Sequence, residues 1–413
     1  MSRDLSHLSL VARNRLWKRL DGAVRQHPVP LSTPLAVVDL AAFDANADDL
    51  VRRANGKRVR VASKSLRVPA LIRRALAHPG FSGVLGFTLA EALWLVAEGI
   101  SDDVVVAYPS VDRAAISRLV TDPAALAAIT LMVDDPAHLD LVEAHRGEVL
   151  SPVRICLDVD ASLHLPGGRV GPRRSPLTNG ARVRRIAEEV VRRPGFTLVG
   201  VMTYEGQVAG VADAVPGHSS RSGAVRALKA ASVRQLAPRR ARVLDVLASV
   251  PGVPELELFN AGGSGSLETS AADPSVTEVT AGSGLLVPGL FDHYRSFSPR
   301  PAAFFGLPVT RRPDADTVTV HGGGLVASGP TGPDRSPIPW APPGLSLVPL
   351  EGAGEVQTPL VGAPASSLAI GDLVWFRHAK SGELFEHVND VHLLDGDRLV
   401  DTVPSYRGAG VAF

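Results

Sequence analysis

The sequence is poor in cysteine, in long apolar runs and in lysine. Its 413 residues include one cysteine, Cys156, which excludes an internal disulfide framework and a metal site built from several cysteines. Cys156 lies in the apolar run 153–157, so we expect a buried, inert thiol. No uncharged apolar run reaches the ~18 residues that a membrane-spanning helix needs, and the first residues include no apolar signal segment. We therefore expect a cytoplasmic protein without a membrane partner.

An excess of charge of either sign is also missing. Lysine and arginine number 43 and aspartate and glutamate 42, so the formal net charge is +1 and no overall field attracts nucleic acid. A content of 45% hydrophobic and 21% charged residues is typical of a globular protein. A chain of 413 residues is too long for one small core, which favours two domains.

The scarcity of lysine draws attention to the few that are present. Of the 43 basic residues, 38 are arginine and only five are lysine, namely Lys18, Lys57, Lys64, Lys229 and Lys380. Arginine keeps its proton, whereas a desolvated lysine can lose its proton and condense with a carbonyl. Lys64 ends the apolar stretch 58–63. It is either a nucleophile or a lysine that caps the end of a strand.

Short apolar runs alternate with helix-like segments between residues 34 and about 285. The eight runs are 35–40, 59–62, 83–87, 104–108, 129–133, 153–157, 198–202 and 256–259. This alternation predicts a TIM-type (β/α)₈ barrel, with an open, doubly wound sheet as the alternative. After residue 300, proline and glycine become dense and the runs are short and β-like, as in 317–320, 373–376, 390–394 and 398–403. We predict an N-terminal helical segment (1–30) packed on a C-terminal all-β domain (301–413), and a barrel over 31–300.

Small residues follow the later runs of the predicted barrel. The eighth run leads into the loop 260–266, Asn-Ala-Gly-Gly-Ser-Gly-Ser, and Thr280-Ala-Gly-Ser-Gly284 follows it. Glycine lets the backbone approach an anion, and barrel phosphate sites recur around strands seven and eight. Lys64 ends the second run, and Asp158, Asp160, Arg169 and Tyr204 lie at other strand ends. A lysine and two anion-binding loops at one rim indicate a phosphorylated aldehyde, for which pyridoxal phosphate is the obvious candidate.

The chain resembles the fold-type III pyridoxal-phosphate enzymes with an alanine-racemase barrel. The branch it resembles contains D-threonine aldolase, D-serine dehydratase-like proteins and proteins labelled amino acid deaminase/aldolase. The resemblance spans about residues 30–410, and it is carried by the segments 34–39, 58–65, 202–206, 262–266, 278–283 and 371–374.

This resemblance implies a set of site residues. Lys64 would be the Schiff-base lysine, and Tyr204 would lie at the face or pyridine side of the cofactor. An arginine after the sixth strand would approach the phenolic oxygen of the ring; Arg169 fits best and Arg173 second. The residues implied for the phosphate are Gly263, Ser264, Gly265, Gly282 and Ser283.

The sequence departs from that branch at its metal site. Members bind a divalent metal through a histidine and a cysteine or aspartate two residues later. Here His378 is retained but the second position is Lys380, and an ammonium group is no metal ligand. Lys380 could replace the charge of the metal, with His378 as general acid or base. Alternatively, His378 could rebuild a metal site with Glu383, Glu386 or His387, or Lys380 could simply pair with a surface glutamate.

The function that these features favour is a lyase for a small amino acid. We expect a pyridoxal-phosphate-dependent aldolase or dehydratase for a β-hydroxy amino acid of D configuration, with Lys64, Tyr204, His378 and Lys380 as its catalytic residues. The resemblance also implies a homodimer with the active site at the subunit interface. The alternatives are an amino-acid racemase, for which Tyr406 is the nominated second acid/base, a pyridoxal-phosphate carrier without turnover, and a sugar-phosphate-binding barrel.

Overall fold

The structure is a computed structural model that describes residues 9–147, 151–297, 300–330 and 332–413. Its contacts divide the chain into two compact units. Of the described residues, those within 49–64, 72–282 and 413 form a barrel unit, and those within 9–48, 65–71 and 283–412 form a β unit. The predicted domain limits near residues 30 and 300 stay predictions, and residues 1–8 of the predicted N-terminal segment lie outside the described part of the chain.

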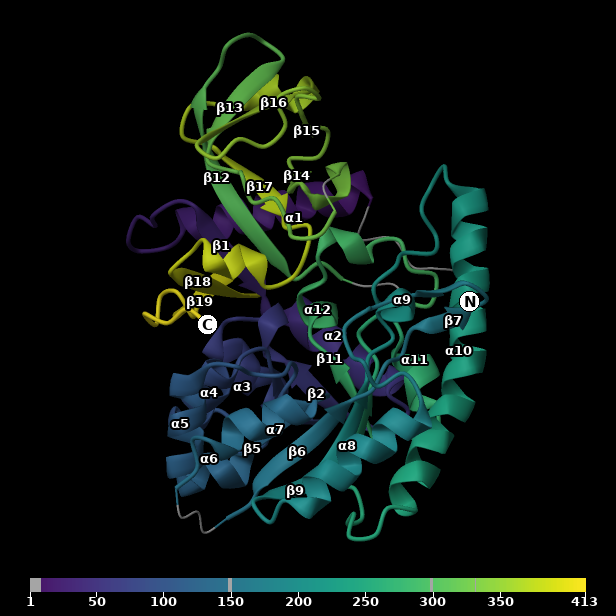
Figure 1. Cartoon of the computed structure of the whole chain (residues 1–413). Helices are drawn as coiled ribbons and strands as arrows, with labels where there is room; N and C mark the ends of the chain where they lie inside the picture. The colour runs from purple at the N-terminus through teal and green to yellow at the C-terminus, as the bar shows by residue number, and fades with distance from the viewer. Residues whose placement is uncertain (1–8, 148–150, 298–299, 331) are drawn as a thin grey trace. The chain divides into compact units, whose positions relative to one another are not determined.

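The barrel unit, drawn mostly in blue to green in Figure 1, is built on eight parallel strands that form a closed ring. Strand β11 pairs with β2, Glu278 opposite Arg58, and this pairing closes the barrel. The predicted (β/α)₈ barrel is therefore confirmed, and the alternative of an open sheet is wrong. In order around the ring, the strands are β10 (Leu258–Ala261), β11 (Glu278–Ala281), β2 (Arg58–Ala62), β3 (Phe81–Gly86), β4 (Val104–Val106), β5 (Ile129–Val133), β6 (Val153–Asp158) and β9 (Phe196–Thr203).

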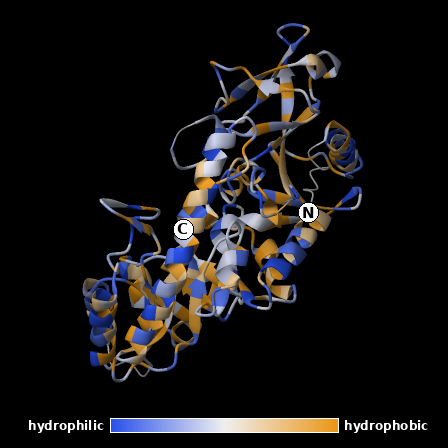
Figure 2. Ribbon diagram, turned by 90° about the vertical axis from the view of Figure 1, so that its right-hand side faces the viewer, coloured by the Kyte–Doolittle hydropathy of each residue, from blue (hydrophilic) through white to orange (hydrophobic). Residues whose placement is uncertain are grey.

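Helices alternate with the strands of the barrel, and several begin at a side chain that caps the first turn. Asp112 caps α5, Asp135 caps α7 and Asn179 caps α8, each by accepting a hydrogen bond from a backbone N–H of the first turn. The longest helix is α10, which carries hydrophilic and hydrophobic residues along its whole length (Figure 2). The helices are α2 (Leu40–Arg53), α3 (Pro69–Ala77), α4 (Leu89–Ala97), α5 (Arg113–Thr121), α6 (Pro123–Ala128), α7 (Pro136–Glu143), α8 (Gly180–Arg192), α9 (Gly206–Ala209), α10 (Ser219–Ala248) and α11 (Leu267–Ala271).

Buried side chains from successive strands pack together in the barrel unit. One cluster takes a residue from each of five strands, β4, β5, β6, β9 and β10, and consists of Val105, Met132, Cys156, Met202 and Leu258. Cys156 is fully buried, as predicted, and burial raises the pKa of its thiol far above the ordinary value.

A fully buried arginine ties the ends of several barrel elements together. The Arg60 guanidinium donates to both carboxylate oxygens of Glu278, at 2.6 and 2.9 Å, and to both of Asp103, at 2.8 and 3.0 Å. Gly83 makes room for this network: its φ is +70°, and a Cβ there would lie 2.4 Å from Arg60 Nη1. The two bidentate pairs link β2 with β11 and with the segment before β4.

The β unit contains a nine-stranded mixed sheet. Its strands follow the order β15–β16–β13–β12–β1–β18–β19, and β17 pairs with both β12 and β14. Asp395-Gly396 forms the hairpin turn between β18 and β19, where Gly396 has φ +54°. The bounds are β1 (Leu35–Asp39), β12 (Ala303–Arg311), β13 (Thr317–His321), β14 (Ile338–Ala341), β15 (Ser346–Leu347), β16 (Gln357–Val361), β17 (Leu373–Arg377), β18 (Asp390–Asp395) and β19 (Arg398–Pro404).

Helix α1 (Leu10–Arg25) packs on this sheet. Its buried residues Leu20 and Ala23 join a cluster with Phe304 and Trp375, and Trp375 Nε1 donates to Asp21 at 2.8 Å. Among the described residues, no helix combines the length and the apolar character needed to cross a membrane.

Strand β1 belongs to the mixed sheet of the β unit and not to the barrel. The run 35–40 was expected as the first barrel strand, but β1 pairs with β12, Leu35 opposite Gly306, and with β18, Ala36 opposite Val391. All five β1 residues are buried, and such a run looks the same in a barrel as in the middle of a mixed sheet. The eighth barrel strand is instead β11. Lys64 therefore follows the first barrel strand in chain order, and the loop 262–266 follows the seventh.

Candidate active site

Lys64 lies just beyond the carboxyl end of β2, in a short 3₁₀ turn (Ser63–Ser65). Its side chain is exposed, and Nζ donates a hydrogen bond of 2.9 Å to the hydroxyl of Tyr108. Tyr108 follows β4 by two residues, so both groups stand at the end of the barrel where ligands bind. Tyr108 is not among the predicted site residues. Its position in the sequence nevertheless indicates a strand end, because Tyr108 ends the apolar run 104–108 in the way that Lys64 ends the stretch 58–63.

Two cations act on the Tyr108 phenol. Arg174 Cζ lies 5.8 Å from the centre of the Tyr108 ring, and the Arg174 side chain hydrogen-bonds to the phenol. Burial alone would raise the pKa of Tyr108, but the charges of Lys64 and Arg174 outweigh burial and lower that pKa below its ordinary value.

The arginines after β6 have three different placements. Arg169 Nη1 donates to Asp160 at 3.3 Å, and Arg173 Nη2 donates to the carbonyl oxygen of Arg169 at 3.1 Å. Arg174 is the arginine that reaches the Lys64–Tyr108 pair. The resemblance implies Arg169 first and Arg173 second for this neighbourhood, because spacing alone does not separate three arginines within six residues.

Tyr204 follows β9 and is the second phenol of this region. Burial, the negative charge of Glu205 and the Tyr108 phenol raise the pKa of Tyr204 to about 12, against the opposing charge of Arg174. Tyr204 therefore stays neutral over the physiological pH range. The pKa of Tyr108, by contrast, is lowered from its ordinary value.

Asp158, the last residue of β6, is a half-buried acid. Burial and the charge of Asp134 raise the pKa of its carboxyl to about 7, with Arg174 opposing and Asp160 adding to the rise. Asp158 therefore exchanges its proton near neutral pH.

Glu205 braces the glycine-rich loop after β10. Its buried carboxylate accepts hydrogen bonds from Arg240 Nη2 at 2.8 Å, from the Ser266 hydroxyl at 2.8 Å, from the Ser270 hydroxyl, and from the Gly262 N–H at 3.3 Å. Glu205 and Arg240 are 1% and 3% exposed. Sequence reasoning did not find this buried ion pair, because the two residues lie 35 positions apart in segments without a shared pattern.

The loop itself is shaped by glycines. A Cβ on Gly263 would lie 3.0 Å from Ala209 Cβ and 3.4 Å from Tyr204 Cε2, so a larger residue would fill the space in front of the Tyr204 ring. Ser264 and Gly265 form the turn that follows, and the Gly282 N–H lies 3.4 Å from Ser264 Oγ. Four of the five predicted phosphate residues thus lie together: Gly263, Ser264, Gly265 and Gly282.

Ser283, the fifth predicted phosphate residue, belongs to the β unit. Its hydroxyl lies 3.1 Å from that of Ser65, and its carbonyl oxygen accepts a hydrogen bond of 3.5 Å from Ser381. It begins the short helix α12 (Ser283–Leu286).

His378 and Lys380 also belong to the β unit. His378 is 2% exposed, neither ring nitrogen has a hydrogen-bond partner among the described residues, and burial and the charge of Arg377 lower its pKa to about 3.

Lys380 Nζ donates to Ser328 Oγ at 2.5 Å, and the Ser328 N–H donates to the Glu383 carboxylate at 3.1 Å. Glu386 pairs with Arg67 at 2.6 Å. In the described ranges, no three His, Cys, Asp or Glu side chains converge as a metal site would require.

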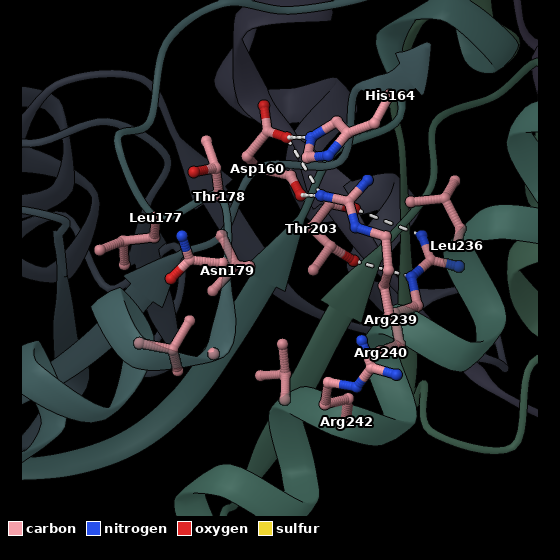
Figure 3. Close-up of a pocket in the computed structure, with 14 residues that line it drawn as sticks. Asp160, His164, Leu177, Thr178, Asn179, Thr203, Leu236, Arg239, Arg240 and Arg242 are labelled. Carbon is pink, nitrogen blue, oxygen red and sulfur yellow. Dashed lines mark hydrogen bonds and ion pairs between the residues drawn. The ribbon is translucent and has the colours of Figure 1, made fainter. Parts of the chain in front are cut away.

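A pocket of about 180 Å³ lies between the first turn of α8 and helix α10 (Figure 3). Asp160 stands at one side of it and accepts hydrogen bonds from Ser162 and Arg239, and His164 Nε2 lies 2.8 Å from the carboxylate. Burial would raise the pKa of Asp160, but these bonds outweigh burial and lower it. Lys64 does not line this pocket, and Asp160 also accepts the hydrogen bond from Arg169.

Solved structures share this fold. The D-threonine aldolase from Filomicrobium marinum superposes with a TM-score of 0.71 and 21% sequence identity, covering 91% of this chain and 95% of that chain. The D-threo-3-hydroxyaspartate dehydratase from Delftia sp. HT23 gives a TM-score of 0.69 and 20% identity, covering 91% and 97%. Alanine racemase from Clostridium difficile 630, in complex with cycloserine, gives 0.62 and 13%, covering 91% and 100%.

The sequence itself matches a family model. No match was found among curated proteins. The model described as alanine racemase, N-terminal domain, matches residues 38–286, which is more than half of the chain. This match confirms the resemblance and the predicted cofactor, pyridoxal phosphate. The chain belongs to the alanine racemase N-terminal domain family, a family of fold-type III pyridoxal-phosphate enzymes.

Proposed function

We propose that the protein is a pyridoxal-phosphate-dependent lyase for a small β-hydroxy amino acid of D configuration. It would act by retro-aldol cleavage or by dehydration. The similar structures named as a D-threonine aldolase and a D-threo-3-hydroxyaspartate dehydratase support this substrate class. The observation that carries the proposal is the exposed Lys64 amine at a barrel strand end, in a unit that also holds the glycine-rich loop after β10.

The barrel residues fit the cofactor. When bound, pyridoxal phosphate supplies an electron sink for negative charge that develops on the substrate. Lys64 would hold the cofactor through its amine, and the same amine would move a proton at the substrate Cα. The Gly265 N–H and the Ser264 hydroxyl would bind the phosphate. Gly263 donates its own N–H to Ser266 Oγ at 3.1 Å, and its absent Cβ leaves room for the phosphate beside Tyr204. Glu205 and Arg240 keep this loop in place.

Tyr204 and Arg174 complete the ligand environment in the barrel. Tyr204, neutral at physiological pH, packs beside the loop, where its ring and hydroxyl would face the cofactor. Arg174 takes the role for which the sequence favoured Arg169, that of an arginine near the phenolic oxygen of the cofactor, since Arg169 is paired with Asp160.

The donor set does not fit the divalent metal expected from the resemblance. His378 is buried, and the described residues offer it no second or third ligand. We propose that the ammonium group of Lys380, oriented by Ser328, supplies positive charge in place of the metal. His378, as general acid or base, and a homodimer stay part of the proposal.

Removal of metal tests the role proposed for Lys380. Activity is expected to be unchanged after treatment with a chelator, and metal analysis should give far less than one ion per chain. Lys380→Cys, which creates a His-x-Cys pair, should gain a bound metal. Loss of native activity on chelation, restored by added metal, contradicts the proposal.

The cofactor assignment is tested with Lys64→Ala. The purified protein should absorb visible light through its lysine-bound cofactor, and the variant should lose this band and its activity, since alanine has no amine. Lys18→Ala is the matched control, because Lys18 is an exposed lysine on α1. A colourless native protein that takes up no added cofactor contradicts the assignment.

A substrate panel separates the reactions. D-serine, D-threonine and 3-hydroxyaspartate are assayed for keto acid, which reports dehydration, and for glycine with an aldehyde, which reports cleavage. Loss of chirality without either product would identify a racemase instead.

A further inference from the structure

The second phenol beside Lys64 carries a further inference, which rests on the proposed role of Lys64. We propose that Tyr108 is a catalytic residue that exchanges a proton directly with Lys64 Nζ whenever the lysine amine is free. The contact is explicit: Nζ donates to the Tyr108 hydroxyl oxygen over 2.9 Å and lies 5.5 Å from the ring centre.

Nucleophilic lysine requires a proton acceptor. A free lysine amine is mostly protonated at neutral pH, since its ordinary pKa is about 10.4, and a protonated amine has no lone pair with which to attack a carbonyl. Tyrosine, with an ordinary pKa of about 10, is closely matched to lysine, so a proton can pass between the two groups at little cost in free energy.

The transfer balances within the pair. After Tyr108 has lost its phenolic proton to solvent, an N–H bond of the Lys64 ammonium breaks and an O–H bond forms on Tyr108. The electron pair of the broken bond stays on Nζ. The products are a neutral amine, which can attack, and a neutral phenol. The reverse transfer returns the proton to Lys64.

The surroundings favour ionisation of Tyr108 over that of Tyr204. Lys64 from the end of β2, Arg174 from the segment after β8 (Gly168–Val170), and Tyr204 from the end of β9 are the titratable and charged groups that act on Tyr108. The two cations lower the pKa of Tyr108, whereas the pKa of Tyr204 rises to about 12. Two neighbouring groups of one chemical type with pKa values pushed apart mark an acid/base assignment. Tyr108 is the exchanging phenol, and Tyr204 is the one that keeps its proton.

The first test needs no activity. The chain has only four tyrosines, so their ionisation can be followed by ultraviolet difference absorbance in cofactor-free protein. One phenol should ionise at lower pH than the others. Tyr108→Phe should abolish this step, Lys64→Met and Arg174→Met should move it to higher pH, and Tyr294→Phe, which alters a buried tyrosine of the β unit, should leave it in place. A low-pH step that survives in Tyr108→Phe overturns the inference.

The second test uses the cofactor-loaded enzyme. Tyr108→Phe should keep the visible band and a KM within a fewfold of the native value, while kcat falls by about 10²-fold, the lower end of the range for general acid–base groups. Arg174→Met retains the phenol and should shift the pH profile of kcat upward. If Tyr108→Phe turns over like the native enzyme with an unchanged pH profile, the inference fails while the proposed function stands. If the native protein binds no cofactor, the proposed function fails, and the titration above still reports on the pair.

Discussion

At the scale of single residues, the region around Lys64 is organised by charge. Arg174 acts on Tyr108, Tyr204 and Asp158 alike, so one exposed guanidinium influences three titratable groups. The sequence placed Lys64, Tyr204 and Asp158 at strand ends correctly, because strand ends follow from hydrophobic runs. It could not rank Arg169, Arg173 and Arg174, because the path of the segment after β6 depends on the Asp160 hydrogen bonds rather than on any local pattern.

Asp158 makes stability depend on pH. Its pKa is about 7 in the folded protein against an ordinary 3.8, so between these values the folded state keeps a proton that the unfolded chain has lost. Stability contributed by the protonated acid is therefore lost as the pH rises from about 4 to about 7. At about 1.4 kcal/mol for each pKa unit, the loss is at most about 4 kcal/mol.

Asp158→Asn should remove this dependence, because asparagine does not ionise. Urea unfolding of cofactor-free protein at several pH values between 4 and 8 measures the effect. Above neutral pH the variant should be the more stable protein. Asp112→Asn is the control, since asparagine also caps a helix and Asp112 is exposed. Parallel stability curves for native protein and Asp158→Asn would contradict the prediction.

At the scale of elements, β2 and β3 depend on a glycine. Gly83 has φ +70°, and a Cβ there would lie 2.4 Å from Arg60 Nη1 and 2.5 Å from Asp103 Oδ2. Gly83→Ala should therefore lower the free energy of unfolding through two separate effects. Backbone strain should cost about 1 kcal/mol or more, and displacement of the buried Arg60 network should cost about 1–3 kcal/mol.

Gly99→Ala separates these two costs. Gly99 also has a positive φ, +59°, but no atom lies within 4 Å of the place that a Cβ would occupy. Its replacement should cost only the backbone strain. Urea midpoints of the two variants give the comparison, and equal losses for both would show that the Arg60 network tolerates the added methyl group.

The existence of most elements followed from the sequence, but the pairing of strands did not. The runs at β2 to β6, β9 and β10 were recognised from their apolar residues. β11, Glu-Val-Thr-Ala, does not stand out as an apolar run because it is four residues long and begins with glutamate. That glutamate is buried here because Arg60 and Arg58 neutralise its charge. The sequence places β1 in the barrel wrongly, because the residues of a buried strand do not indicate which strands it pairs with.

At the scale of the whole molecule, each unit has a core of its own. Three of the four tryptophans, Trp17, Trp340 and Trp375, belong to the β unit, and Trp94 belongs to the barrel unit. Tryptophan fluorescence should therefore report mainly on the β unit, whereas far-ultraviolet circular dichroism should report mainly on the helices of the barrel unit.

We expect the urea transitions seen by these two probes not to coincide, because two separate cores need not unfold together. Trp94→Phe should leave the fluorescence transition where it is. Coincident transitions at all protein concentrations would show that the chain unfolds as one cooperative body.

The pairing of β1 with β12 also sets an order of events during synthesis. Leu35 leaves the ribosome early, but Gly306, its partner across the strands, is translated only after the last barrel strand is complete. Because domains generally fold as units while the chain is still growing, the nascent barrel can assemble first. Until then the apolar segment Leu35–Val38 has no sheet to join, and it is the part of the growing chain that a chaperone would be expected to shield.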